Sequence, residues 1–172
     1  MKKILITGTN GMLGKDIYEA LREDDQNIIY AINRNKDTRI SNSYATDIRN
    51  FQIISQIIND IKPDIVIHTA ALVDVDYCEN NREIAYDVNV SASKNLAKLC
   101  KRMIYISTDS VYNGFDGNFV EDATKQPINY YAETKSIAED EILMVNSNSI
   151  IVRTNIYGFH KPIVDFCRTV AL

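Results

Sequence analysis

The sequence lacks several features that would place it in a particular class of protein. Its 172 residues include 19 lysines and arginines against 23 acidic residues, so no basic excess favours binding to nucleic acid. No cluster of basic residues indicates a membrane surface, and apolar runs such as DIVIHTAALV fall short of the ~20 residues that a membrane span needs. We therefore expect a soluble protein of one main domain, with neither nucleic acid nor a membrane as its partner.

Signals for secretion and for metal binding are also missing. The N-terminal stretch MKKILITG has no apolar core and no small-residue cleavage site, so it is expected to be the mature start. Cys78, Cys100 and Cys167 are far apart and have no metal-ligand spacing. They are expected to be reduced thiols of a cytoplasmic protein, and no carboxylate cluster argues for a metal.

Short β-like runs alternate with longer helical patterns along the chain. Strands are expected at residues 3–7, 27–32, 64–70, 103–107 and 149–154. Helices are expected at residues 12–21, 51–61, 83–100 and 130–145. The strands are continuously apolar, which is typical of a parallel sheet covered on both faces. The sequence therefore predicts an α/β protein with a Rossmann-type doubly wound parallel sheet and helices on both faces.

The first strand leads directly into the glycine-rich stretch TGTNGMLG and then into the first helix. Its glycines, Gly8, Gly11 and Gly14, are three residues apart. Glycine allows a tight turn, a close approach of the backbone to a pyrophosphate, and close packing of helix on strand. The helix N-terminus beyond the loop offers free N–H groups to phosphates. This placement predicts a dinucleotide site rather than a merely tight turn.

The end of the second strand bears on which dinucleotide would bind. An acidic residue there would accept hydrogen bonds from the ribose of NAD, whereas an arginine would pair with the extra phosphate of NADP. The stretch AINRNKD has Arg34 at this point and Lys36 close behind, while Asp37 comes too late for the acidic role. This favours NADPH, with NADH as the other donor; the alternative is that Arg34 and Lys36 belong to a solvated loop.

The stretch NYYAETK contains two adjacent tyrosines, of which only Tyr131 has a lysine four residues later, Lys135. Residues four apart share a helix face, and a nearby ammonium would pull the pKa of a phenol down from about 10. Tyr130 pairs instead with the uncharged Thr134 and points elsewhere, so it is expected to be a packing residue.

A hydroxyl at the end of the fourth expected strand would complete this site. The stretch YISTDSVYNG offers Ser107 and Thr108, and either could hydrogen-bond a substrate oxygen at the ligand-binding edge of the sheet. We choose Thr108 from the pattern of the resemblance described next, and keep Ser107 as the alternative. His68 is expected to be a hydrogen-bonded structural residue rather than a base.

The glycine spacing resembles the extended short-chain dehydrogenase/reductase superfamily. With HTAALVDVDYCE, VN at 88–89, STDSVYNG, YYAETK and RTNIYG, the whole chain resembles the dTDP-4-dehydrorhamnose reductases. The resemblance implies Thr108, Tyr131 and Lys135 as catalytic residues. It implies that the cofactor contacts Gly8, Asn10, Gly11, Met12, Leu13, Arg34, Asp47, Ile48, Ala70, Ala71, Asn89, Tyr131 and Lys135.

That family reduces the 4-keto group of a dTDP-6-deoxy-4-keto sugar with NAD(P)H, giving dTDP-L-rhamnose for bacterial surface polysaccharide. The resemblance thus implies a nucleotide-sugar substrate and is compatible with a homodimer, although the sequence does not fix the oligomeric state. It also implies an NAD(P)-binding domain at residues 1–157, with residues 158–172 as the start of a truncated substrate-binding region. The chain would be either a fragment or a natural truncation, with impaired activity. Two rivals stay open: an NAD-dependent nucleotide-sugar epimerase or dehydratase, and a non-catalytic dinucleotide-binding module.

Overall fold

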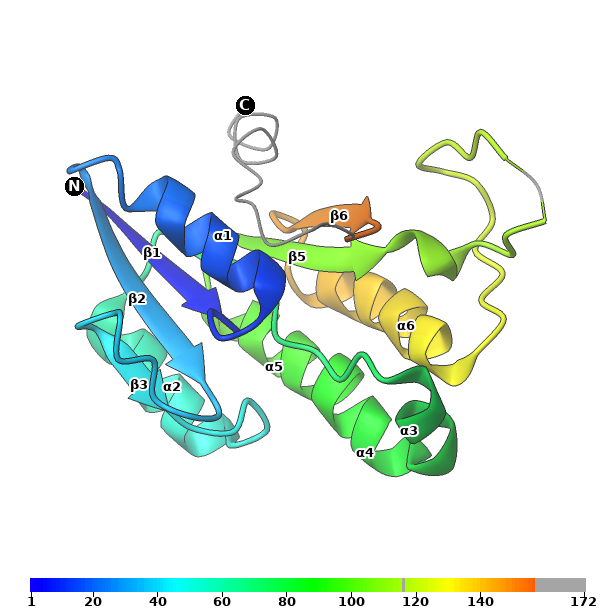
Figure 1. Cartoon of the computed structure of the whole chain (residues 1–172), viewed down its shortest axis with the longest axis horizontal. Coiled ribbons are helices and arrows are strands. Elements are labelled where there is room, and N and C mark those ends of the chain that lie inside the picture. The colour runs from blue at the N-terminus through cyan, green and yellow to red at the C-terminus, as the bar shows by residue number, and fades with distance from the viewer. Residues whose placement is uncertain (116, 157–172) are drawn as a thin grey trace.

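The computed structural model describes residues 1–115 and 117–156, which form a six-stranded parallel sheet with helices on both faces (Figure 1). The strands are β1 (Lys2–Thr7), β2 (Asn27–Asn33), β3 (Ser43–Ala45), β4 (Ile65–His68), β5 (Met103–Thr108) and β6 (Ile150–Thr154). The helices are α1 (Met12–Leu21), α2 (Phe51–Ile61), α3 (Val75–Asn80), α4 (Arg82–Tyr86), α5 (Ala92–Leu99) and α6 (Tyr130–Val145). A π-helical turn, η1 (Asp87–Ser91), joins α4 to α5, and a 3₁₀ turn, η2 (Asp109–Val111), follows β5. This confirms the predicted fold class.

The strand order is β3-β2-β1-β4-β5-β6. The chain therefore winds outward from β1 in one direction and then from β4 in the other. The switch between the two directions lies between β1 and β4, where Ile4 to Thr7 pair with Ile65 to His68. In sheets of this kind, ligands bind outside the carboxyl ends of the strands at the switch point.

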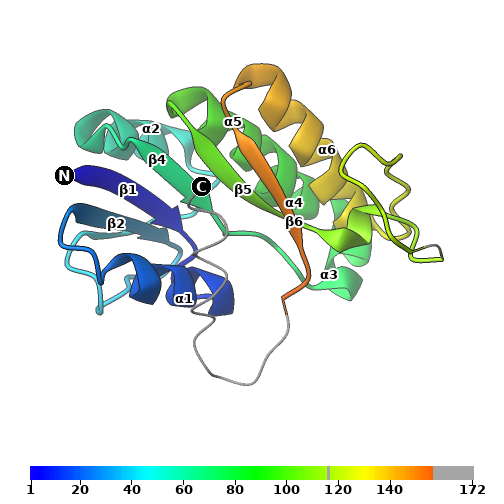
Figure 2. The same cartoon turned by 90° about the horizontal axis from the view of Figure 1, so that it is seen from above.

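The helices cover the sheet unequally. Helix α1 packs on one face, and α2, α5 and α6 pack on the other (Figure 2). The larger core, on the three-helix face, is formed by Leu5, Ile32, Ile54, Ile57, Ile58, Ile61, Val66, Val90, Leu96, Ala97, Cys100, Met103, Tyr105, Ala138 and Ile142. The spacing of the isoleucines in α2 places one apolar stripe against the sheet, as the sequence predicts.

Local capping explains where two of these helices begin and end. Asn50 accepts a hydrogen bond from the Ile53 N–H at the start of α2, and Asn129 accepts one from the Ala132 N–H at the start of α6. Helix α2 ends at Lys62, which adopts a left-handed conformation, and Pro63 follows it.

Three elements differ from the sequence-based expectations. Strand β3 and helix α3 at residues 75–80 were not among the expected elements, and the helix expected at 83–100 is interrupted by η1. The predicted second region at 158–172, with Cys167, lies outside the described residues. None of the helices in the described part of the chain is long and apolar enough to cross a membrane.

Candidate functional site

The carboxyl ends of the parallel strands bring the predicted site residues to one edge of the sheet. Gly8 follows β1, Arg34 follows β2, Ala70 lies just after β4, and Thr108 ends β5. Helix α6, which carries Tyr131, packs against β5 and η2. Residues that are far apart in the sequence thus surround the switch point between β1 and β4.

The glycine loop packs tightly between α1 and the segment that follows β4. Gly8 has φ +85°, and a Cβ added there would lie 2.8 Å from Thr69 Oγ1 and 2.9 Å from the Ala70 nitrogen. A Cβ on Gly14 would overlap the Gly8 carbonyl. These two glycines let α1 approach β1 closely, as a dinucleotide loop requires.

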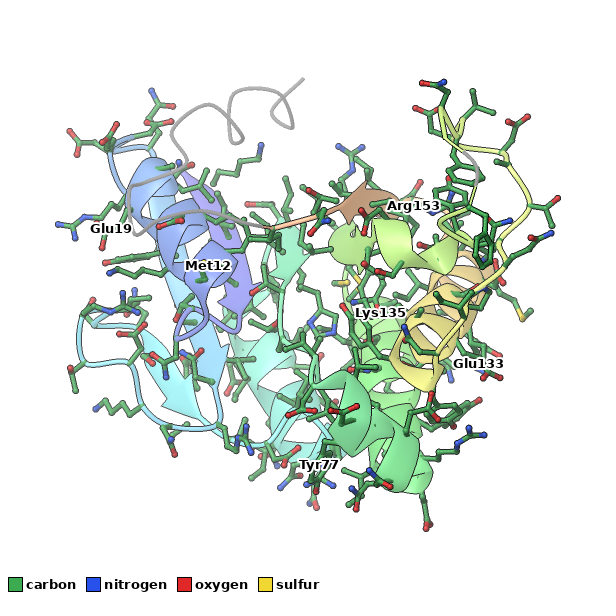
Figure 3. The ribbon with its side chains drawn as sticks, turned by 45° about the vertical axis from the view of Figure 1, so that its right-hand side comes forward. Met12, Glu19, Tyr77, Glu133, Lys135 and Arg153 are labelled. Carbon is green, nitrogen blue, oxygen red and sulfur yellow. The ribbon has the colours of Figure 1, made fainter. Side chains whose placement is uncertain are left out.

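Helix α1 points its N-terminus toward this edge (Figure 3). Gly11 is the N-cap and makes no side-chain cap, so the first N–H groups of the helix, including those of Met12 and Leu13, have no acceptor within the helix. The Leu13 side chain is buried in the core beneath α1, whereas Met12 is 51% exposed. Leu13 could therefore meet a phosphate only through its backbone.

Asn10 and Thr9 attach the glycine loop to the end of β2. The Asn10 N–H donates to Asn33 Oδ1 at 3.2 Å, and Asn10 Nδ2 donates to the Asn35 carbonyl at 3.0 Å. Asn33 Nδ2 donates to Thr9 Oγ1 at 2.9 Å. These contacts hold the loop in one conformation before any ligand arrives.

Asp37 and Arg39 complete this attachment, and sequence reasoning missed both roles. Buried Asp37 accepts from Thr9 Oγ1 at 2.7 Å and from Arg39 Nη2 at 2.6 Å, and Arg39 Nη2 also donates to the Thr9 carbonyl at 2.8 Å. The hydrogen bond from Arg39 holds the pKa of the Asp37 carboxyl below its usual value, against the effect of burial. The only signal in the sequence was their position close to the end of β2, three and five residues after Arg34.

Arg34 and Lys36 are exposed at the end of β2, where the sequence predicted them. Asp47 forms an ion pair with Arg49 at 2.7 Å, which together with the more distant charge of Arg34 lowers the pKa of its carboxyl. Ile48 is half-buried against the larger core. Asp47 and Ile48 thus follow β3, the neighbour of β2 in the sheet.

Asn89 is buried, not solvated, and connects two parts of the site. Its Oδ1 accepts from the Leu72 N–H at 2.8 Å, and its Nδ2 donates to the Leu72 carbonyl and to Thr134 Oγ1, both at 3.0 Å. It therefore ties the segment of Ala70 and Ala71 to helix α6. Asn89 lies in η1, and such π-helical turns are frequent at functional sites.

The two hydroxyls at the end of β5 have different surroundings. Ser107 is buried and donates to Glu139 Oε1 at 2.5 Å, so its hydroxyl is occupied within the protein. Thr108 Oγ1 accepts from the Ser110 N–H at 3.1 Å and donates to Asp109 Oδ1 at 3.3 Å, and it lies close enough to Tyr131 to lower the pKa of the phenol. The structure therefore brings Thr108, rather than Ser107, to the tyrosine.

Lys135 lies on the side of α6 that faces the sheet (Figure 3). Its Nζ donates to the Ile106 carbonyl at 2.7 Å and lies 4.0 Å from the centre of the Tyr105 ring. Burial lowers the pKa of Lys135 to about 7, while the charge of Glu139 acts in the opposite direction.

The expected lowering of the Tyr131 pKa by Lys135 is wrong for this structure. Burial raises the pKa of the Tyr131 phenol, and the nearby Thr108 hydroxyl opposes that shift. The spacing of four residues is as predicted, but the long lysine side chain turns to a main-chain carbonyl of β5 instead of the phenol.

Tyr130 packs away from the catalytic candidates. The Arg82 guanidinium lies 4.6 Å from the centre of the Tyr130 ring, and the Tyr130 backbone N–H donates to Glu79 Oε1 at 2.7 Å.

His68 is buried and hydrogen-bonded on both ring nitrogens, as expected. Cys78 and Cys100 are free thiols, and no group of three or more metal-ligating side chains occurs within residues 1–115 and 117–156.

Known proteins match this arrangement over most of the chain. The family model of the RmlD substrate binding domain matches residues 1–170. The dTDP-4-dehydrorhamnose reductase of Bacillus anthracis, solved in complex with NADP, is 31% identical with a TM-score of 0.80, covering 92% of this chain and 57% of that one.

Two further relatives have different names. The probable low-salt glycan biosynthesis reductase of Haloferax volcanii is 32% identical over 89% of this chain and 53% of its own length. The methionine adenosyltransferase 2 subunit beta of Xenopus laevis is 30% identical over 91% of this chain and 48% of its own length. The chain spans about half the length of the curated relatives it matches. It belongs to the family of the RmlD substrate binding domain, and among known enzymes it resembles the dTDP-4-dehydrorhamnose reductases.

Proposed function

We propose that this chain is the dinucleotide-binding part of an NADPH-dependent reductase that acts on the 4-keto group of a dTDP-6-deoxy-4-keto sugar. The observation that carries the proposal is the placement of Thr108, Tyr131 and Lys135 at the carboxyl end of β5, on the same edge of the sheet as the glycine loop. The enzyme would act in the cytoplasm, and its product would be dTDP-L-rhamnose for bacterial surface polysaccharide. Residues 158–172 would begin the sugar-binding region.

The residues present fit a dinucleotide. The Gly8 turn leaves no room for a side chain, and the first N–H groups of α1 are free to meet a pyrophosphate. Arg34, exposed at the end of β2, would pair with the 2′-phosphate of NADPH. Asp47 and Ile48 would flank the adenine, and Ala70 and Ala71 would let the backbone approach the nicotinamide side.

In the proposed reaction, bound NADPH supplies the hydride that goes to the carbonyl carbon of the sugar. Tyr131 gives its phenolic proton to the carbonyl oxygen, and Thr108 orients that oxygen by a hydrogen bond. A pKa raised by burial keeps Tyr131 protonated at neutral pH, which is the form that a proton donor needs. Lys135 would hold the nicotinamide ribose, and Asn89 would fix the neighbouring segment at Leu72.

A second candidate is a non-catalytic dinucleotide-binding subunit. It is favoured by the 30% identity to the methionine adenosyltransferase 2 subunit beta of Xenopus laevis. Against it, a module that only binds has no need of Thr108, Tyr131 and Lys135 together. A homodimer would be compatible with either function.

The first test is a titration with NADPH and with NADH, followed by the fluorescence of the nicotinamide. We expect micromolar binding of NADPH and weaker binding of NADH. Arg34→Ala should weaken NADPH binding by roughly 10-fold or more and leave NADH almost unchanged, because a charge-assisted hydrogen bond contributes ~1.5–3 kcal/mol.

Arg22→Ala is the matched control, because Arg22 is an exposed arginine that pairs with Glu19 at the far end of α1. It should change neither affinity. Equal affinities of the unmodified chain for the two nucleotides would contradict the role of Arg34, and failure to bind either would contradict the proposed function.

A further inference from the structure

A buried carboxylate on α6 joins four parts of the molecule. Glu139 is 1% exposed and lies one helical turn after Lys135. It accepts from Ser107 Oγ at 2.5 Å and from Arg153 Nη2 at 2.7 Å, with Arg153 Nε at 3.1 Å. Lys125 Nζ lies 3.5 Å from its Oε2. A carboxylate buried this deeply is stable only when it is paired and hydrogen-bonded, so these partners hold one another in place.

Arg153 extends the cluster from β6 to the chain that follows β5 (Figure 3). Its Nη1 donates to Tyr112 Oη at 2.6 Å and to the Glu121 carbonyl at 2.8 Å. Tyr112 Oη in turn donates to the Val120 carbonyl at 3.0 Å. One guanidinium therefore ties the sheet edge and α6 to residues 117–126, which we call the clamped segment.

Lys125 fixes the other end of the clamped segment. Its Nζ donates to the Ser136 carbonyl at 2.9 Å and forms an ion pair with Asp140 at 2.7 Å. The clamped segment has no helix or strand of its own, so these side-chain contacts supply much of its order.

Three of the parts held by Glu139 and Arg153 either carry a residue of the proposed site or lead directly to one. Ser107 immediately precedes Thr108 on β5, and Lys135 lies one turn before Glu139 on α6. The clamped segment runs into Asn129, the N-cap of α6, which directly precedes Tyr130 and Tyr131.

We propose that Glu139 and Arg153 are positioning residues, whose buried ion pair fixes the end of β5, helix α6 and the clamped segment relative to one another around Lys135. The ion pair and its hydrogen bonds are observed contacts, whereas a role for them in catalysis rests on the proposed function. No direct contact of either side chain with substrate or cofactor is implied.

The ion pair should also set the electrostatic surroundings of Lys135. The groups that face Lys135 or lie near it are the Tyr105 ring from β5, neutral His68 from β4, and Tyr131 and Glu139 from α6. Among them Glu139 carries the charge, which Arg153 at 2.7 Å and Lys125 at 3.5 Å balance. Removing Glu139 should favour the neutral amine of Lys135, whereas removing Arg153 should favour the ammonium.

These opposite directions separate a positioning role from a general loss of stability. The titration of Lys135 can be followed by NMR in protein labelled with ¹³C at lysine Cε, with the signal assigned by its loss in Lys135→Met. We expect the midpoint to shift down by about half a unit or more in Glu139→Gln and up in Arg153→Met. Arg153→Lys keeps the charge and should leave the midpoint close to that of the unmodified chain.

Hydrogen exchange followed by mass spectrometry tests whether the ion pair holds the clamped segment in place. Amides of the clamped segment should exchange roughly 10-fold faster in both variants, because Arg153→Lys loses the hydrogen bond to the Glu121 carbonyl and Glu139→Gln loses the ion pairs with Lys125 and Arg153. Glu141→Gln is the matched control: Glu141 lies on the same helix and pairs with Lys94, without touching the segment. It should change neither the exchange nor the midpoint.

Shifts of the Lys135 midpoint in the same direction in Glu139→Gln and Arg153→Met would overturn the proposal, as would unchanged exchange in the clamped segment. Neither readout needs a bound nucleotide. Failure of NADPH binding would therefore contradict the proposed function while leaving this inference to be decided by its own two measurements.

Discussion

At the scale of single residues, the two adjacent tyrosines at the start of α6 have different chemical surroundings. Tyr131 is half-buried and lies near Thr108, whereas Tyr130 packs against the exposed Arg82. A helix turns each residue by about 100° from the one before it, so neighbours on α6 face different parts of the protein. Of the two, only Tyr131 lies near Thr108, at the carboxyl end of β5.

This difference gives the first prediction. Tyr131→Phe should lower the rate of NADPH oxidation by the dTDP-4-keto sugar by roughly 10²- to 10⁴-fold, because it removes the proton donor. Tyr130→Phe keeps the ring and loses only an outward hydroxyl, so its rate should stay within about 3-fold. The comparison is made in single turnovers with bound NADPH and excess sugar. Equal losses in the two variants would remove Tyr131 from the proposed mechanism.

Sequence motifs predicted which residues gather at this edge, but not how each side chain is oriented there. The run of hydroxyls at Ser107 and Thr108 left two candidates, and the choice depends on Glu139, which lies more than thirty residues later in the chain. The spacing of Tyr131 and Lys135 predicts a shared helix face, yet the lysine has enough rotatable bonds to reach the Ile106 carbonyl. Such choices depend on tertiary contacts that a local pattern does not contain.

At the scale of secondary-structure elements, His68 connects three of them at the switch point. Ser93 Oγ on α5 donates to the Asn89 carbonyl at 2.7 Å, so His68 Nε2 must donate to Ser93, at 2.9 Å. His68 Nδ1 then accepts from Thr7 Oγ1 on β1 at 2.6 Å. This network assigns a neutral imidazole with its proton on Nε2, and complete burial lowers the pKa of His68 to about 3.

A pH dependence of stability follows from this burial. Between pH 6.5 and 3 the unfolded chain protonates His68 and the folded chain does not, so the free energy of unfolding should fall as the pH is lowered through this range. From pH 7 to pH 5 the loss should be about 2 kcal/mol, measured by urea unfolding. In His68→Gln, which cannot titrate, the stability should be lower at pH 7 but should no longer show this drop. An equal drop in both proteins would assign it to other groups.

The sequence predicted long periodic elements well and short or irregular ones poorly. The expected ranges 12–21, 51–61 and 130–145 coincide with α1, α2 and α6, because each has an apolar stripe or a clear cap. Strand β3 has three residues and lies at the sheet edge, so its apolar content was too small to register. The π-helical turn at Asn89 depends on the bonds of that side chain to Leu72 and Thr134, which no local periodicity reveals.

At the scale of the whole molecule, binding the nucleotide and binding the sugar place different demands on the chain. The glycine loop, the end of β2 and the α1 N-terminus, which would hold the nucleotide, all lie within residues 1–115 and are linked by hydrogen bonds. The match to the Bacillus anthracis reductase, in contrast, covers 57% of that protein. Contacts to the sugar that lie in the remainder of such a reductase have no counterpart in the matched residues.

We therefore expect this 172-residue chain to bind NADPH well and to reduce the sugar poorly. Binding energy from parts of a substrate remote from the reacting carbon is used to orient it, so losing those contacts should lower the rate as well as the affinity. The value of kcat/KM for the dTDP-4-keto sugar, measured by the loss of NADPH absorbance, should be at least ~10-fold below that of the Bacillus anthracis enzyme assayed alongside it. Comparable kcat/KM values for the two proteins would contradict this expectation. Residues 1–172 would then suffice to bind the sugar, and the sugar-binding contacts would lie among these residues.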